Sequence, residues 1–199
     1  MSTTLRDGTG KGTLAEVTSS NKLMTLGVTE TISAHHAFEG DAYNVNTGTI
    51  NLTSANKSAL LYFKNLEDED IVITALFYLL GNSDGSGDTL VQVERNPTGG
   101  SITTAGTSFV PVNRNFGSNK TLNVTCEKGA EADTLTGGTV AIESVFNAVG
   151  RKVLSVGAIV LPRGSAIGVT VTPPASNTDM DVQIAMSCYK VQETTLENK

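Results

Sequence analysis

Two apolar runs of strand length, separated by a short acidic segment, constrain the fold of this chain most strongly. Ala59–Phe63 (ALLYF) and Ile71–Leu80 (IVITALFYLL) flank Glu67–Asp70 (EDED). Short runs rich in β-branched and aromatic residues, bounded by turn-forming residues, are typical of buried β-strands. Both alternating faces of the second run are apolar, so we expect that strand to be central or covered on both sides. Regular alternation places Val72, Thr74, Leu76 and Tyr78 on one face and Ile71, Ile73, Ala75, Phe77 and Leu79 on the other.

Further strand patterns recur along the chain, with turn-forming residues about every 8–15 residues, which is the spacing of an all-β sandwich. Pro111 favours an edge strand, and Pro162–Gly164 favours a tight hairpin connection. A short helix is expected around His35–Phe38. No strand–helix–strand alternation is present, so we expect an antiparallel β-sandwich or jelly roll with an extended N-terminal arm. The other expected strands are Thr49–Thr53, Lys57–Asn65, Thr89–Arg95, Thr107–Asn113, Thr121–Glu127, Val140–Val149, Lys152–Leu161, Ala166–Thr172 and Met180–Tyr189.

The chain of 199 residues is long enough for one domain with its own core and an appendage, and two small domains are the alternative. We expect residues 1–46 to form an arm with short strands around Ser19–Asn21, and its polar start, Met1–Gly12, to be flexible or ordered by a partner. Residues 47–190 form the expected sandwich, and residues 191–199 form a polar tail.

The charge of the chain is low and negative, which excludes several classes of function. Charged residues make up 17% of the sequence, below the roughly 25% that is usual in soluble domains. The net charge is −6 and the basic residues are scattered, so phosphate-backbone binding is not expected. No apolar run is long enough to span a membrane. The N-terminus lacks the apolar core of a secretory signal, so we expect synthesis in the cytoplasm without signal-directed export.

Three features resemble chemical sites but are better explained otherwise. Gly8–Gly12 (GTGKG) lacks the preceding strand and the Lys-Ser/Thr ending of a nucleotide-binding loop. His35 and His36 are adjacent, which on a strand would point them to opposite faces, and they are expected to be solvated loop residues. Cys126 and Cys188 are far apart without a CxxC partner, which favours two buried free thiols over a disulfide and does not fit a zinc site.

The acidic segments are also expected to be surface turns. Asp84–Asp88 (DGSGD) resembles part of a calcium loop but lacks the rest of the twelve-residue pattern, so a hairpin turn is favoured. Glu67–Asp70 is expected to be a solvated loop tip, with contact to a basic partner as the alternative. The looser turn of Glu127, Glu131 and Asp133 has the same interpretation. We therefore predict no catalytic, cofactor-binding or metal-binding residues and no enzymatic activity.

Many strand and turn segments, spread from Arg6 to Tyr189, resemble a family of virion proteins of tailed bacteriophages. These segments describe fold better than role, and no catalytic residue is carried over. The residues that carry the resemblance are Arg6–Gly10, Ala15–Val17, Asn21–Leu23, Gly40–Gly48, Ile50–Thr53, Ala59–Asn65, Glu67-Asp68, Arg95–Pro97, Pro111–Asn113, Asn115–Ser118, Lys128–Glu131, Leu161–Ser165 and Val171–Pro174.

The resemblance implies a β-sandwich component of a virus particle, on the capsid surface or the tail. The first hypothesis is a capsid decoration (cement) protein, a homotrimer that binds the major capsid protein or other virion proteins, with an arm that adds strands to neighbours. The alternative is a tail or fibre module whose loops, such as Asn82–Asp88 or Asn96–Gly106, bind a host glycan. An enzyme, for example a glycoside hydrolase fragment, is the third hypothesis and the least supported by the sequence.

Overall fold

The computed structural model describes residues 16–17, 23–24, 31–147, 150–154 and 159–191. The chain divides into two units, Met1–Thr31 and Ile32–Lys199. In the first unit the described residues form two short antiparallel strands, β1 (Glu16–Val17) and β2 (Leu23–Met24). They fall in the segment predicted to contain two strands. The expectations for Met1–Gly12, Ser19–Asn21 and residues 192–199 lie outside the described residues.

The second unit is an all-β sandwich of two six-stranded antiparallel sheets, as the sequence predicted. Sheet I has the order β10 (Thr139–Phe146), β6 (Thr89–Arg95), β13 (Ala166–Thr172), β4 (Ser58–Asn65), β9 (Val124–Lys128) and β7 (Thr107–Ser108). Sheet II has the order β11 (Gly150–Leu154), β5 (Ile71–Ser83), β14 (Met180–Lys190), β3 (Ala42–Leu52) and β8 (Val112–Asn113), and β12 (Ile159–Leu161) also pairs with β5.

The strand pairing is nested, which identifies the sandwich as a jelly roll. β3 pairs with β14, β4 with β13, β5 with β12, and β6 with β10. Successive pairs fall alternately in sheet II and sheet I. A long antiparallel hairpin rolled up in this way forms two facing sheets whose inner side chains make one core.

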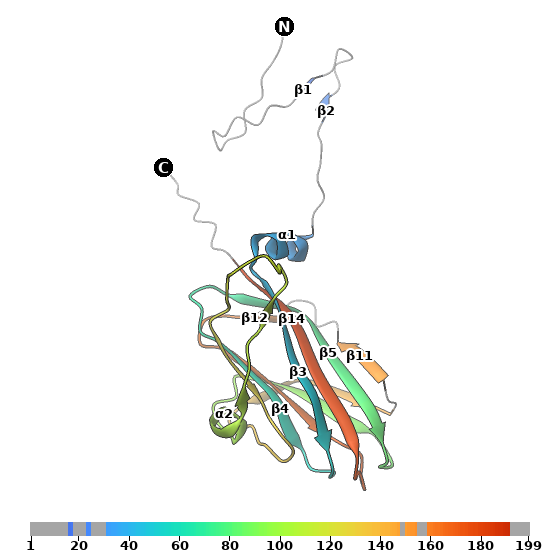
Figure 1. Cartoon of the computed structure of the whole chain (residues 1–199). Helices are drawn as coiled ribbons and strands as arrows, with labels where there is room; N and C mark the ends of the chain where they lie inside the picture. The colour runs from blue at the N-terminus through green and yellow to red at the C-terminus, as the bar shows by residue number, and fades with distance from the viewer. Residues whose placement is uncertain (1–15, 18–22, 25–30, 148–149, 155–158, 192–199) are drawn as a thin grey trace. The chain divides into compact units, whose positions relative to one another are not determined.

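The two sheets differ in how their outer faces are covered. Sheet I carries α2 (Ile102–Ala105), whose Ile102 is fully buried in a small cluster with Ala59, Tyr62 and Ala166. This cover explains why nearly every residue of β4 is buried, on both of its faces. Sheet II is covered at one end by α1 (Ile32–Glu39), which confirms the short helix expected around His35–Phe38. Figure 1 shows α1 across the end of the sandwich and α2 beside β4.

An irregularity in β5 decides which of its side chains face outward. In the pairing of β14 with β5, the register shifts between Ser187 and Cys188, and the Thr74 hydroxyl donates to the Ser187 carbonyl oxygen at 3.2 Å. Thr74 is therefore the extra residue of a β-bulge, which inverts the alternation beyond it. The prediction that Ile71, Ile73 and the later odd-numbered residues share one face was wrong. The inner, buried face consists of Ile71, Ile73, Leu76, Tyr78 and Leu80.

Several predicted boundaries also differ from the structure. The sandwich unit begins at Ile32 and β3 at Ala42, not at residue 47, because Tyr43 and Val45 point into the core between outward asparagines. The predicted strand Lys152–Leu161 is two strands, β11 and β12. Pro162–Gly164 leads from β12 in sheet II to β13 in sheet I, so it is not a hairpin. The predicted strand Thr107–Asn113 is two short strands, β7 and β8, at the edges of different sheets, and Pro111 lies between them in neither strand.

Candidate interaction surface

The outer face of sheet II, over β8, β3, β14 and β5, carries no charged side chain in its central part. The burial of β14 alternates strictly, with Met180, Val182 and Ile184 inside and the intervening residues outside. Figure 1 shows β3, β14 and β5 side by side at the front of the sandwich. The outward residues of this region, named here the neutral face, are Asn44, Asn46, Thr49, Ala75, Phe77, Leu79, Val112, Gln183, Ala185 and Ser187.

Hydrogen bonds between strands fix the polar side chains of the neutral face. The amide of Gln183 donates to Oδ1 of Asn46 at 2.7 Å, and the Ser187 hydroxyl donates to Oδ1 of Asn44 at 3.0 Å. These groups border a shallow hollow of about 390 Å³ whose other side is formed by Phe77 and Leu79. Depletion of charge around an apolar centre is the compositional signature of a protein–protein interface.

Exposed apolar residues continue from this surface toward α1, on either side of Arg114, whose guanidinium donates to the Ser33 hydroxyl of the helix at 2.9 Å. Val112 pairs with Asn44 at the edge of sheet II and is exposed. The loop that follows β8 is tied to the helix, because the amide of Asn115 donates to the Phe38 carbonyl oxygen at 2.9 Å. Phe116 and Phe38 remain 93% and 77% exposed on this end of the sandwich. Large apolar side chains that are this exposed are more typical of a protein contact surface than of a surface that faces only water.

His36 is not the solvated loop residue that the sequence predicted. It lies on α1 and its ring stacks on Tyr189 of β14, with centroids 4.3 Å apart and planes 10° from parallel. Its Nδ1 is buried and has no hydrogen-bond partner. Burial lowers the pKa of His36, and the neighbouring His35 lowers it further, against the raising effects of Asp41 and Glu39. His35 is exposed, and its ring meets that of His36 edge to face, with the centroids 5.9 Å apart.

The acidic segment Glu67–Asp70 binds groups of its own chain. Asp68 pairs with Arg163, and Glu67 and Glu69 lie 3.7 and 4.0 Å from the Lys190 ammonium. The backbone N–H of Asn123 also donates to Glu67 at 2.7 Å. The segment therefore ties the β4–β5 turn to the end of β14 and to the loop after β12. Three of the four carboxylates, those of Glu67, Asp68 and Glu69, are thus paired within the chain, which weakens the alternative of a contact to a basic partner.

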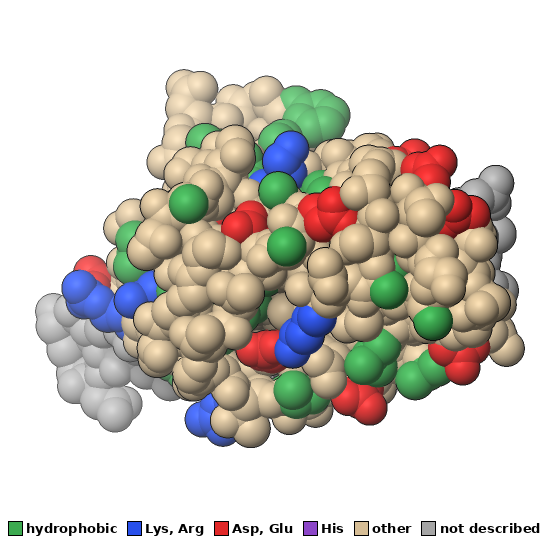
Figure 2. All heavy atoms as spheres, turned by 90° about the horizontal axis from the view of Figure 1, so that it is seen from below, with side chains coloured by type: hydrophobic (Ala, Val, Ile, Leu, Met, Phe, Trp, Pro, Cys, Tyr) green, Lys and Arg blue, Asp and Glu red, His purple; other side chains and the backbone are tan. Residues whose placement is uncertain are grey.

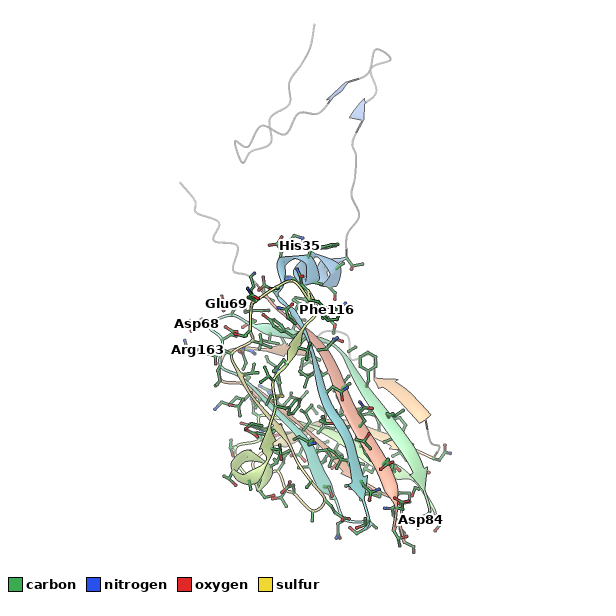
Figure 3. The ribbon with its side chains drawn as sticks, in the orientation of Figure 1. His35, Asp68, Glu69, Asp84, Phe116 and Arg163 are labelled. Carbon is green, nitrogen blue, oxygen red and sulfur yellow. The ribbon has the colours of Figure 1, made fainter. Side chains whose placement is uncertain are left out.

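The calcium-like segment Asp84–Asp88 is a structural turn. Asp84 accepts hydrogen bonds from the N–H groups of Thr178 and Asp179 at 2.7 and 3.1 Å, and from the Thr178 hydroxyl. The bonds from Thr178 lower the pKa of the Asp84 carboxyl group. Figure 3 shows Asp84 at the end of the sandwich opposite Asp68, Glu69 and Arg163. The two acidic segments are thus far apart and cannot form a joint site.

Glu127, Glu131 and Asp133 each accept local hydrogen bonds. The Ser108 hydroxyl donates to Glu127 at 2.8 Å, and the Ser101 hydroxyl donates to Asp133 at 2.6 Å. Bonds from Ser54 and Thr53 lower the pKa of Glu131. Glu127 lies on β9, not in the predicted turn, whereas Glu131 and Asp133 lie in the turn after β9 and hold it in place.

Cys126 and Cys188 are buried free thiols, as predicted. Burial raises the pKa of Cys188 to about 12 and raises that of Cys126 well above its usual value. Over the described residues, no cluster of three or more histidine, cysteine or carboxylate side chains could hold a metal ion. Within the same part of the chain, none of the helices is both long and apolar enough to span a membrane.

The sequence did not reveal the neutral face. Asn44, Asn46, Gln183 and Ser187 are ordinary outward residues of two strands that are far apart in the chain. Only the register of β3 with β14 brings them together. The one available signal was the low charged fraction of the sequence. Figure 2 shows the end of the sandwich, where neutral side chains and backbone cover most of the surface around a few groups of charged side chains.

Comparisons with known proteins give no family assignment. No family model matches the chain, and no curated protein does. A solved structure of infectious bursal disease virus, Gt strain, aligns at 12% identity with a TM-score of 0.12. The alignment covers 79% of this chain and 40% of that one. A TM-score this low carries no argument about fold or function.

Proposed function

We propose that the protein is a structural component of a bacteriophage particle, a capsid decoration protein that stabilises the head through protein–protein contacts. The neutral face is the observation that carries this proposal, and the resemblance of the strand and turn segments to phage virion proteins supports it. Within the described residues, Glu67–Glu69, Asp84, His36 and the two cysteines serve packing or loop structure. The partner is the major capsid protein, and the location is the virion.

The proposal includes a homotrimer in which the neutral face contacts the neighbouring copy. Each copy carries a net charge of −6, so identical copies repel one another over most of their surfaces. In a cyclic trimer the neutral face of one copy contacts a different surface of the next copy, and its lack of charge lowers the electrostatic cost of that contact. The apolar side chains Leu79 and Val112, 44% and 61% exposed, then gain burial in the contact.

Quantitative mass spectrometry of purified particles tests the decoration role. We expect a copy number close to that of the major capsid protein. A few copies per particle would instead favour the tail or fibre alternative.

That alternative has one observation in its favour, because the hollow of the neutral face places amides beside Phe77, and amides beside an aromatic ring suit a saccharide. Saccharide-array binding together with low copy number would replace the decoration proposal.

Light scattering of the isolated protein tests the trimer. The expected mass is about three times the 20.8 kDa of the chain. Ala185→Glu adds a charge at the centre of the neutral face and is expected to give monomers. Lys64→Glu is the matched control, because Lys64 is a partly exposed residue of β4 in the opposite sheet. A trimer that survives Ala185→Glu would exclude the neutral face as the subunit contact.

A further inference from the structure

An apolar cavity of about 330 Å³ opens between the two sheets, at the side of the sandwich where β10 and β12 are edge strands. Its depth is lined by the buried side chains of Val93, Leu161 and Ile167. Ile142 of β10 and Ile159 of β12, both partly exposed, line it from the two edges. A register shift between Val140 and Ile142 makes Ala141 the extra residue of a bulge at this position.

The side chain of Arg95 begins on the inner face of sheet I, at the mouth of this cavity. Arg95 is the last residue of β6, and it pairs with Ile167 of β13 and Thr139 of β10. Residues that pair across an antiparallel sheet share a face, and Ile167 points into the core. Arg95 therefore continues the inward row of Val91 and Val93, and it lines the cavity where that row reaches solvent.

The positive charge of Arg95 is not compensated within the described part of the chain. The neighbouring Glu94 also lines the cavity, but its buried carboxylate is paired with the Lys57 ammonium at 2.9 Å. The Arg95 guanidinium has no hydrogen-bond or ion-pair partner among the described residues. Two further donors line the same cavity. Oδ1 of Asn96 accepts the N–H of Ala166 at 3.0 Å, which leaves its NH₂ group available, and the Ser165 hydroxyl makes no hydrogen bond in that part of the chain.

We propose that this cavity binds a small amphipathic anion, an aliphatic chain with one carboxylate at its end. The chain lies among Val93, Ile142 and Ile159, where its burial is favourable. The carboxylate lies at the mouth, where Arg95 donates two parallel hydrogen bonds and Asn96 and Ser165 complete the coordination. An apolar interior with a few convergent polar groups is the usual composition of a ligand site. The inference is independent of the proposed virion role.

The volume sets the length of the ligand. A heavy atom with its hydrogens occupies roughly the 30 Å³ share of a water molecule in the liquid, so the cavity holds about ten heavy atoms. Octanoate fits this size. Butyrate is too short to fill the apolar part, and palmitate is too long. We therefore expect affinity to rise from butyrate to octanoate and to fall again for palmitate.

Calorimetric titration of the full chain with octanoate tests the proposal. Saturable binding of one equivalent is expected, with octanol bound at least tenfold more weakly because it lacks the charge that pairs with Arg95. Arg95→Met is expected to weaken octanoate at least tenfold and to leave octanol unchanged. Arg163→Met is the matched control, because Arg163 is an exposed arginine near the same region that pairs with Asp68 and does not line the cavity. Equal binding of octanoate by wild type and Arg95→Met would overturn the role of Arg95.

Isoleucine methyl spectra locate the ligand without any substitution. Ile142, Ile159 and Ile167 line the cavity, whereas Ile50 and Ile184 lie in the core of sheet II and do not line it. Octanoate is expected to shift the first three methyl signals and to leave the other two in place. Shifts spread over all five signals, or no saturable shift up to millimolar octanoate, would refute the site.

Discussion

The imidazole ring of His36 lies flat on the phenol ring of Tyr189, with 4.3 Å between the ring centroids. This stack attaches α1 to the last strand of the sandwich. Since Nδ1 of His36 is buried without a partner, the contact favours the neutral ring. The position of α1 is therefore coupled to the protonation of one side chain.

The attachment of α1 is predicted to weaken in mild acid. The pKa of His36 is lower in the folded protein than the 6.5 of the unfolded chain. Below pH 6.5 the unfolded chain therefore binds more protons than the folded protein. The free energy of unfolding then decreases as the pH is lowered, until the pH is below the pKa of His36 in the folded protein. Hydrogen exchange of α1 amides between pH 5 and 8 measures this. His36→Phe keeps a stacked ring but has no titrating group. In this variant the exchange rate of the α1 amides, corrected for the intrinsic rate, is expected not to increase in mild acid.

The two fully buried tyrosines are predicted to respond oppositely to loss of their hydroxyl groups. The Tyr43 hydroxyl donates to the Gly40 carbonyl oxygen at 3.2 Å, whereas the Tyr78 hydroxyl has no partner. Tyr43→Phe should lower the free energy of unfolding by about 1 kcal/mol, and Tyr78→Phe should raise it by about 1 kcal/mol. Urea denaturation measures both. A change of the same sign in the two variants would contradict the prediction.

Both thiols are predicted to be unreactive in the folded protein. The thiolate is the reactive form, and burial raises the pKa of Cys126 and of Cys188, the latter to about 12. With a thiol-specific chromogenic reagent at pH 8, we expect no rapid labelling of native protein and two equivalents in denaturant. Labelling of the native protein within seconds would show that one of the thiols is accessible.

Gly129 is predicted to be intolerant of any side chain. A Cβ atom at this position would overlap the carbonyl oxygen of Ala59 in β4. Gly129→Ala should lower the free energy of unfolding by roughly 1–3 kcal/mol. Gly117→Ala is the control, because the nearest atom to its Cβ would be Oδ1 of Asn115 at 3.5 Å, an ordinary contact. We expect the control to stay within about 0.5 kcal/mol of the wild type.

The sequence predicted strands best where a single pattern governs a whole segment. Thr89–Arg95 and Ala166–Thr172 were predicted with the boundaries that β6 and β13 have. The two apolar runs became β4 and β5, since strong β propensity and burial agree there. The fold class followed from these strands and their turns, because few architectures accommodate so many short antiparallel strands.

What the sequence did not predict depends on contacts between distant residues. In the sequence Thr74 looks like any other strand residue. Only the pairing of β5 with β14 shows that Thr74 has no partner of its own and forms a bulge. The partners of Glu67–Asp70, which are Arg163 and Lys190, are distant in the chain. The neutral face and the position of Arg95 both require the register of paired strands. Local sequence patterns specify single strands, whereas a surface or cavity of the sandwich depends on how distant strands pair.

The nested pairing also imposes an order on folding. Thr47 of β3 and Ile184 of β14 hydrogen-bond across a separation of 137 residues. During synthesis β3 is the first strand of the sandwich to emerge, yet β14, its long partner in sheet II, is the last strand to appear. Until then its backbone is an unpaired edge that other chains can join. Closing such long loops is slow, so nascent chains crowded on one messenger are exposed to exchange of β14 between copies before each sandwich is sealed.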